Sequence, residues 1–228
     1  MQTIRNNNSI LEKFKRIYSM FLNDKLALIS IIFLIFILII AIFGPSLTSN
    51  SFTKMNLRLR NLAPFSFDHN MMYFLGADAL GRSMIARLII GTQNTMFIAA
   101  SAVLLSMTFG GVLGLISGYF GGKIGNFIMR LADVIMSFPS LLLAVIVLYM
   151  FDPGLINLVM VLAFTRMPIY MRTARAEVLE IRERLFVAAA VSMGASHLRI
   201  IFKHIAPLTI PTLITIATLD FAFVMLGE

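Results

Sequence analysis

The sequence predicts an all-α integral membrane protein, a bundle of helices that crosses the bilayer several times. Of its 228 residues, 59% are hydrophobic and only 13% are charged, and the charges lie mostly between long apolar runs. A soluble domain carries about 45–50% apolar and about 25% charged residues, so this chain has too few charges to cover a water-exposed surface. The length fits one membrane domain of about five or six spans, because each span needs about 20 residues.

The first span is expected at residues 26–43, an apolar run of eighteen residues without a charge that ends at Gly44-Pro45. A cleaved signal peptide has a shorter apolar core and a small-residue cleavage site. We therefore interpret this run as a retained span. It is preceded by a polar segment, residues 1–25, that contains five basic residues.

Four further spans are expected at residues 94–116, 134–151, 154–171 and 205–227. The third has Pro139 in its first turns, the fourth is interrupted by Arg166 and Pro168, and the fifth contains Asp220. Such interruptions are typical of helices that line a pathway or pack against protein. The chain ends directly after the fifth apolar run, which we interpret as a truncation before a sixth span.

Small residues recur at every fourth position of the second span: Ala102, Ser106, Gly110, Gly114 and Gly118. In a helix this spacing forms one stripe, along which a neighbouring backbone can approach closely. We interpret the stripe as a surface for helix packing within the chain, with a subunit contact as the alternative.

The basic residues predict a multi-pass orientation with the N-terminus in the cytoplasm. In that orientation the cytoplasmic segments, residues 1–25, 119–130 and 172–203, hold thirteen Lys and Arg residues, whereas the outer segments hold five. Cytoplasmic loops carry such an excess of Lys and Arg. Because the net charge of +8 is distributed between apolar runs, it does not form the basic face of a nucleic-acid-binding module, and no nucleic-acid partner is expected.

The loop between the fourth and fifth spans, about residues 172–204, is charged in its first half and then contains an apolar stretch, residues 186–193, that stops at Gly194. Glycine there can take the left-handed conformation that ends a helix. Ser196 is placed to cap a following helix over residues 198–204, after which Pro207 marks re-entry into the membrane. The apolar surface of a short helix between charged segments must be shielded from water by another molecule. We favour a groove of a soluble protein, and the alternative is an interfacial helix lying on lipid.

The spacing of Ala189-Ala190, Gly194 and Pro207 resembles the cytoplasmic coupling motif of ABC importer permeases, Glu-Ala-Ala followed by Gly and then Ile-x-Leu-Pro. Ala188 stands where that pattern has Glu. The ending His204-Ile205-Ala206-Pro207 is similar to the His-Ile-Leu-Pro of the dipeptide, oligopeptide and nickel branch, with Ala206 in place of Leu.

Other stretches resemble the same branch. Residues 75–82 read Leu-Gly-Ala-Asp-Ala-Leu-Gly-Arg and are similar to its LGTDxLGRD element. Residues 118–122 and Arg130, Asp133 and Pro139 match the loop and the start of the third span. The resemblance covers about residues 21–228.

The resemblance implies the transmembrane domain of a type I ABC importer over residues 93–228, incomplete at its end, after an N-terminal part over residues 1–92. It implies a permease subunit of the bacterial inner membrane that forms the pathway for di- or oligopeptides. The implied partners are a second permease subunit, two ATP-binding subunits, an extracytoplasmic solute-binding protein and membrane lipid. The residues implied to couple to an ATPase are Phe186, Ala188, Ala189, Ala190, Gly194, Ala195, His204 and Pro207.

We expect no enzyme activity and no cofactor in this subunit, because it lacks the GxxxxGK[ST] phosphate loop of nucleotide-binding proteins. ATP hydrolysis is expected on separate partners. The chain has no cysteine, and its three histidines are scattered. His197 and His204, seven residues apart, have no acidic or Cys companions at ligand spacing, so no metal site is expected.

Two charged residues inside spans, Asp220 and Arg166, are candidates to line or gate the pathway. The alternatives are a structurally satisfied acid at Asp220 and an Arg166 side chain that extends toward the membrane surface. Arg130 and Asp133, three residues apart, are expected to form a structural ion pair on one helix face.

Other functions remain as alternatives to a peptide permease. The cargo could be nickel or another small solute, and the chain could be an inactive truncated remnant. An intramembrane enzyme would need paired Asp residues or a Ser/His dyad at membrane depth. Asp220 has no second acid within a span, and the histidines lie in predicted loops.

Overall fold

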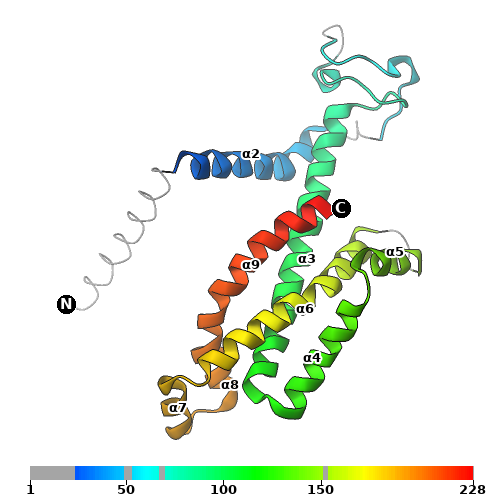
Figure 1. Ribbon diagram of the computed structural model, residues 1–228. Coiled ribbons are helices and arrows are strands. Elements are labelled where there is room, and N and C mark those ends of the chain that lie inside the picture. Colours follow the sequence, from blue (N-terminus) through cyan, green and yellow to red (C-terminus); the bar gives the residue numbers. More distant parts are fainter. Residues whose placement is uncertain (1–23, 49–52, 67–69, 151–153, 228) are drawn as a thin grey trace, which may run out of the picture. The chain divides into compact units, whose positions relative to one another are not determined.

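The computed structural model describes residues 24–48, 53–66, 70–150 and 154–227, and these form helices joined by turns and by a longer loop before residue 84 (Figure 1). Two compact units are present, residues 1–94 and 95–228. The predicted all-α class is confirmed: within the described ranges the β-structure is limited to one isolated bridge, between Ala77 and Ser83.

In the first unit, helix α2 (Lys25–Thr48) contains the first predicted span. Asp24 caps its start, because one oxygen of its carboxylate accepts the backbone N–H groups of Leu26 and Ala27 at 3.1 and 3.2 Å. The helix is apolar on all sides and almost entirely uncovered within the described chain, as expected of a helix that faces lipid.

The loop after α2 is folded around Asp78. Its carboxylate accepts the backbone N–H groups of Leu80 and Arg82, both at 2.9 Å, and is also paired with Arg82 Nε and Arg87 Nη1, both at 2.8 Å. The Arg82 backbone N–H leads these contacts in lowering the pKa of Asp78 from 3.8 to about 2. Two short 3-10 turns, Leu57–Leu59 and Met71–Tyr73, complete the loop.

The second unit is built from helices α3 to α9. Their bounds are α3 Met84–Phe120 (which begins in the first unit), α4 Gly122–Ser137, α5 Ser140–Met150, α6 Leu155–Ile181, α7 Leu185–Ser192, α8 His197–Arg199, a π-helical segment Ile200–Ile205 and α9 Ala206–Gly227. Helix α6 is its central element and contacts α4, α5 and α9. Figure 1 places α7 and α8 together at one end of this unit.

Four helical stretches among the described residues are long and apolar enough to cross a membrane: Lys25–Ser46, Met84–Phe120, Leu155–Ile181 and His197–Leu226. They contain the first, second, fourth and fifth predicted spans, apart from the first residue of the fourth and the last residue of the fifth.

The third prediction, one helix over residues 134–151, is wrong. The structure breaks that stretch into α4 and α5 at Phe138, whose backbone is extended (φ −91°, ψ 133°). A proline disfavours the helical conformation of the residue before it, so Pro139 ends α4 where the prediction had left it inside a span.

The small-residue stripe of α3 packs against α6, as predicted. An added Cβ at Gly110 would lie 2.6 Å from the Met167 carbonyl oxygen, and one at Gly114 would lie 2.5 Å from that of Met171. Ser106 Oγ donates to the Ala163 carbonyl oxygen at 2.9 Å. The stripe therefore allows close contact of the two backbones, the kind of packing that drives helix association where lipid surrounds the helices.

Candidate functional site

Helix α7, the apolar helix of the predicted coupling loop, divides its residues between a packed face and an uncovered one. Val187 and Ala190 are buried in a cluster with residues of α6 and the π-helical segment. On the other side Leu185 is 89% exposed, and Met193, just after the helix, is 81% exposed. An apolar helix with one face left open is a candidate docking surface.

The predicted helix end at Gly194 is confirmed. Its φ of 77° lies in the left-handed region, its N–H donates to the Val191 carbonyl oxygen at 2.9 Å, and the Ala195 N–H donates to that of Ala190 at 3.1 Å. This pair of hydrogen bonds is a Schellman motif. The end of α7 is thus fixed by its backbone.

The remaining predicted coupling residues differ in exposure. Ala188 and Ala189 lie on the open face of α7 with Phe186. Ala195 and His204 are half-buried, and Pro207 is exposed in the first turn of α9. A contact with an ATPase stays a prediction for all of these residues.

The structure after α7 differs from the prediction, which was a short helix over residues 198–204 followed by a separate membrane span that begins near Pro207. Helix α8, the π-helical segment and α9 follow one another without a break. Ser196 occupies the cap position, but its side chain makes no capping hydrogen bond. Within the π-helical turn the Ala206 N–H donates to the Ile201 carbonyl oxygen, five residues back. Pro207 has no N–H and its ring crowds the carbonyl four residues back, and the wider turn accommodates it.

The two charged residues predicted inside spans meet each other. Asp220, only 4% exposed, pairs through one carboxylate oxygen with Arg166 Nη1 at 3.4 Å. Tyr170 donates its hydroxyl to the other oxygen at 3.1 Å. The Arg166 side chain therefore pairs with a residue inside the bundle. It does not extend toward the membrane surface, the alternative that the sequence had suggested. The contact joins α6 to α9 near the middle of both helices.

Sequence reasoning missed Tyr170. The available signal was its position four residues after Arg166, which places both on one face of a helix. A buried tyrosine also needs a partner for its hydroxyl, and Asp220 is the acid available inside a span.

Asp133 pairs with Arg172 of α6 at 2.6 Å, and the expected pair with Arg130 on its own helix is wrong. Both side chains of the observed pair are about half exposed. Spacing along one helix permitted the Arg130 pair, but the neighbouring helix supplied the partner. An exposed pair of this kind contributes about 0–1 kcal/mol to stability.

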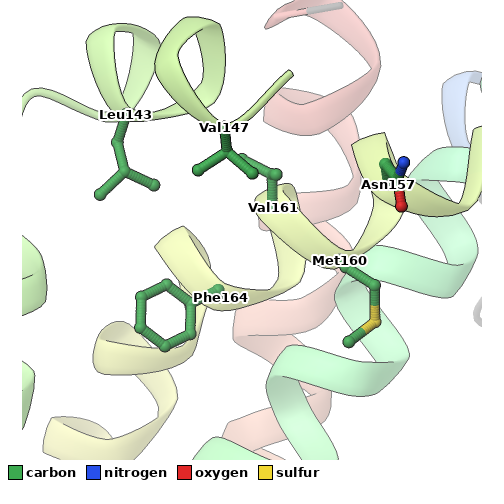
Figure 2. Close-up of a pocket in the computed structure, with 6 residues that line it drawn as sticks. All are labelled: Leu143, Val147, Asn157, Met160, Val161 and Phe164. Carbon is green, nitrogen blue, oxygen red and sulfur yellow. The ribbon is translucent and has the colours of Figure 1, made fainter. Parts of the chain in front are cut away.

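Among the described residues, several cavities lie along α6, and three of them have the following linings. One of about 270 Å³ is lined by Ile135, Met136, Phe138, Thr165, Arg166 and Ile169. A second, of about 310 Å³, lies between α5 and α6 and is lined by Leu143, Val147, Asn157, Met160, Val161 and Phe164 (Figure 2). Met160 and Phe164 also line a third, of about 330 Å³, that reaches α3. The linings of the last two are largely apolar and uncharged, so the guanidinium of Arg166 is the one charged group among the residues named for these three cavities.

Comparison with known proteins identifies the family. The family described as binding-protein-dependent transport system inner membrane component matches residues 110–228, and the N-terminal transmembrane domain of oligopeptide transport permease C matches residues 13–64. Both descriptions name membrane components of transport systems, as the sequence motifs predicted.

Relatives agree with this assignment. The chain is 36% identical to a dipeptide transport system permease protein of Alkalihalophilus pseudofirmus, over 89% of this chain and 65% of the relative. It is 34% identical to the corresponding protein of Haemophilus influenzae, over 89% and 69%. It is also 35% identical to a nickel transport system permease protein of Escherichia coli, over 68% and 56%. The chain thus spans about two thirds or less of the length of these relatives.

The apolar helices, the motifs in their order along the chain and these matches together establish that the chain belongs to the family of inner membrane components of binding-protein-dependent transport systems.

Proposed function

We propose that this chain is a pathway-forming permease subunit of an ATP-driven importer for di- or oligopeptides. A second permease subunit completes the pathway, two ATP-binding subunits drive it, and an extracytoplasmic solute-binding protein delivers the solute. The observation that carries this proposal is α7: a short apolar helix, fixed at its end by the Gly194 turn, with one face packed and one face open. The dipeptide permeases among the relatives support the cargo.

The position of α7 favours a protein partner over lipid. Helix α6 becomes charged from Arg172 onward and continues to Ile181, which adds about 14 Å of helix at 1.5 Å per residue. Ion pairs such as Arg184–Glu180 surround the start of α7. Its open apolar face therefore lies beyond a charged stretch of helix, where a protein groove can cover it.

The packed face of α7 suggests how movement reaches the membrane. Val187 and Ala190 share a buried cluster with Val178 of α6 and with Ile200 and Ile201 of the π-helical segment. Close-packed side chains move together because their contacts cannot deform continuously. An ATPase that displaces α7 would therefore displace α6 and α9 with it, a rigid-body change of the kind that opens and closes transport pathways. Nucleotide and its hydrolysis belong to the partner subunits.

The Asp220, Arg166 and Tyr170 cluster is our candidate for the pathway or its gate. Charged groups at membrane depth usually face a water-filled cavity or a partner. Here Arg166 borders a cavity while it holds Asp220. Removal of the Arg166 charge would leave the buried Asp220 carboxylate without its ion-pair partner.

Site-specific labelling tests the orientation and the docking helix. The chain contains no cysteine, so Ala189→Cys introduces a single thiol on the open face of α7. We expect a membrane-impermeant maleimide to label this thiol in inside-out vesicles and not in right-side-out vesicles. Added ATP-binding subunits should protect it.

Two matched variants control this experiment. Leu57→Cys, in the exposed loop after α2, should show the opposite sidedness, and Val187→Cys, on the packed face, should label poorly from either side. Labelling of Ala189→Cys from the outer side alone, or labelling unaffected by the ATP-binding subunits, would contradict the proposal.

Nickel is the second candidate cargo, because the nickel permease match covers 68% of this chain at 35% identity. Uptake into proteoliposomes that contain the complete importer separates the two. Peptide transport predicts ATP-dependent accumulation of tritiated dialanine that unlabelled nickel does not reduce. Accumulation of radioactive nickel without that of dialanine would favour the second candidate.

A further inference from the structure

The turn between α3 and α4, residues 117–125, lies at the same end of the second unit as α7 and α8 (Figure 1). We call it the corner. The backbone reverses there at Gly121 and Gly122, whose φ values are 58° and 50°. Glycine adopts positive φ values without the steric cost that other residues meet. Helix α4 can therefore begin directly after α3 ends.

Buried polar contacts fix the corner to α6. Arg175 donates through Nη1 to the Gly125 carbonyl oxygen at 2.9 Å and to Ser117 Oγ at 3.3 Å. Ser117, which is fully buried, donates its hydroxyl to the same carbonyl at 3.1 Å. Hydrogen bonds from a charged donor are about twice as strong as neutral ones. Helices α3, α4 and α6 are therefore joined at one point.

Two further contacts connect the corner to the chain on either side of α7. Before α7, Arg182 donates through Nη1 to the Gly118 carbonyl oxygen at 3.2 Å. After α7, His197 Nδ1 and Tyr119 Oη share a hydrogen bond of 2.8 Å. The two rings also meet edge to face, with centroids 5.6 Å apart. The segment that carries α7 is therefore attached to α3 at both of its ends.

The Tyr119–His197 contact differs in kind from the other attachments of α7. Among the side-chain hydrogen bonds described for residues 185–199, it is the one that reaches another element. Val187 and Ala190 attach α7 by apolar packing, and apolar burial is non-directional. A hydrogen bond requires a defined distance and angle. This contact therefore sets the position of the turn after α7 relative to the end of α3.

We propose that Tyr119 and His197 form a latch that fixes the turn after α7 to the corner, so that force applied to α7 enters the end of α3 directly as well as through the buried cluster behind α7. This inference rests on the proposed function of α7 as the helix to which an ATPase docks. Without the latch, α7 still docks because its open face is unchanged, and apolar packing on Leu115 and the Arg182 hydrogen bond to Gly118 still connect it to α3. The turn after α7 is then no longer held in one position relative to the end of α3. Tyr119 is a positioning residue, since it acts on the pathway through His197.

The test uses the complete importer in proteoliposomes and the variant Tyr119→Phe, which removes only the hydroxyl. We expect the ATP-binding subunits to copurify as before and hydrolysis stimulated by the solute-binding protein to persist. Uptake of tritiated dialanine per ATP hydrolysed should fall about threefold or more, the scale of one lost hydrogen bond. The control Tyr149→Phe, in α5 and 91% exposed, should leave this ratio unchanged.

A pair of His197 variants gives the same information if Tyr119→Phe does not assemble. His197→Asn keeps a polar atom near the position of Nδ1 and should retain the ratio of uptake to hydrolysis, whereas His197→Ala should lose it. The double variant Tyr119→Phe/His197→Ala should be no worse than either single change, because the two residues act through one contact.

Three outcomes would overturn the latch: a wild-type ratio in Tyr119→Phe, a wild-type ratio in His197→Ala, or equal losses of hydrolysis and uptake. A different result would contradict the proposed function itself. In that case the unaltered chain would assemble with no ATP-binding subunit or show no hydrolysis stimulated by the solute-binding protein, and the latch would fall with it.

Discussion

At the scale of single residues, the carboxylates of Asp78 and Asp220 both have hydrogen-bond and ion-pair partners, but in different surroundings. Asp78 lies in a loop and accepts two backbone N–H groups and two guanidinium groups. Asp220 lies within α9 and is held by Arg166 and Tyr170. Each links parts of the chain that hydrophobic burial alone would not hold in register, because hydrogen bonds to a charged group require specific partners.

The loop around Asp78 should weaken only in strong acid. Its folded-state pKa of about 2 lies below the ordinary 3.8. Its contribution is therefore complete above about pH 4 and is lost as the pH falls toward about 2. Hydrogen exchange of the Leu80 and Arg82 amides, corrected for intrinsic rates, should show protection that declines over this range.

Asp78→Asn provides the control for this titration. It removes the charge, so protection of the two amides should already be low and should not vary with pH between about 5 and about 2. Loss of protection in the unaltered chain near neutral pH would contradict the assignment.

At the scale of elements, packing and proline decide where helices meet and end. Small residues of α3 allow α6 to approach closely, Pro139 divides one apolar run into α4 and α5, and Pro207 follows a π-helical turn that leaves the helix unbroken. The prolines were visible in the sequence. The helix ends before Pro139 but continues through Pro207. The difference lies in the backbone before each proline, which is extended at Phe138 and forms a wider π-helical turn before Pro207.

Gly114→Ala should destabilise the bundle by about 1–3 kcal/mol. The new methyl group would lie 2.5 Å from the Met171 carbonyl oxygen and 2.6 Å from the Ala174 side chain, so the two helices would have to separate. Thermal denaturation in detergent measures the change as a lower Tm.

Gly111→Ala, one turn away on the same helix, is the matched control. Its methyl group would meet only Leu213 Cδ1, at 3.1 Å, and the end of a leucine side chain can move aside. A Tm loss as large as that of Gly114→Ala would show that close contact of α3 and α6 is not the cause.

At the scale of the whole molecule, the open face of α7 and the helices behind it connect an exposed surface to the interior of the second unit. The turn at Gly194 fixes the end of α7 by backbone hydrogen bonds. The buried cluster packs α7 against α6 and the start of α9, so these helices should move together. Coupling to an ATPase would require this connection to be rigid.

Gly194→Val should reduce solute uptake per ATP hydrolysed while the chain still inserts into the membrane. An added Cβ meets no atom within 4 Å, so the cost is conformational: about 1–2 kcal/mol for a side chain in the left-handed region, and more for a β-branched one. The turn should open and α7 should lose its fixed position. Uptake and hydrolysis measured together in proteoliposomes report the change.

Gly194→Asn serves as the comparison, because asparagine tolerates positive φ values. It should stay close to the unaltered importer. A Gly194→Val variant that couples normally would mean that the turn is not needed to hold α7.

The order of the elements was largely predictable from the sequence because long apolar runs, glycine and proline act locally. Hydropathy located four of the five predicted spans, and Gly194 marked a helix end from its residue type alone. The apolar stretch before Gly194 predicted the short helix α7 within its loop from local sequence alone. The third span failed because hydropathy averages over a window and does not register the break at Pro139.

The partners of the charged and polar side chains were decided only by the tertiary structure. Asp133 pairs with Arg172 and not with Arg130, Arg166 turns to Asp220, and Tyr119 meets His197 from 78 residues away. The amino-acid sequence by itself determined most of the segments that are helical and apolar enough to cross a membrane, because burial of apolar surface depends on composition within a segment. Which side chains meet depends on how the helices rotate and cross, and that is fixed by packing among segments far apart in the chain.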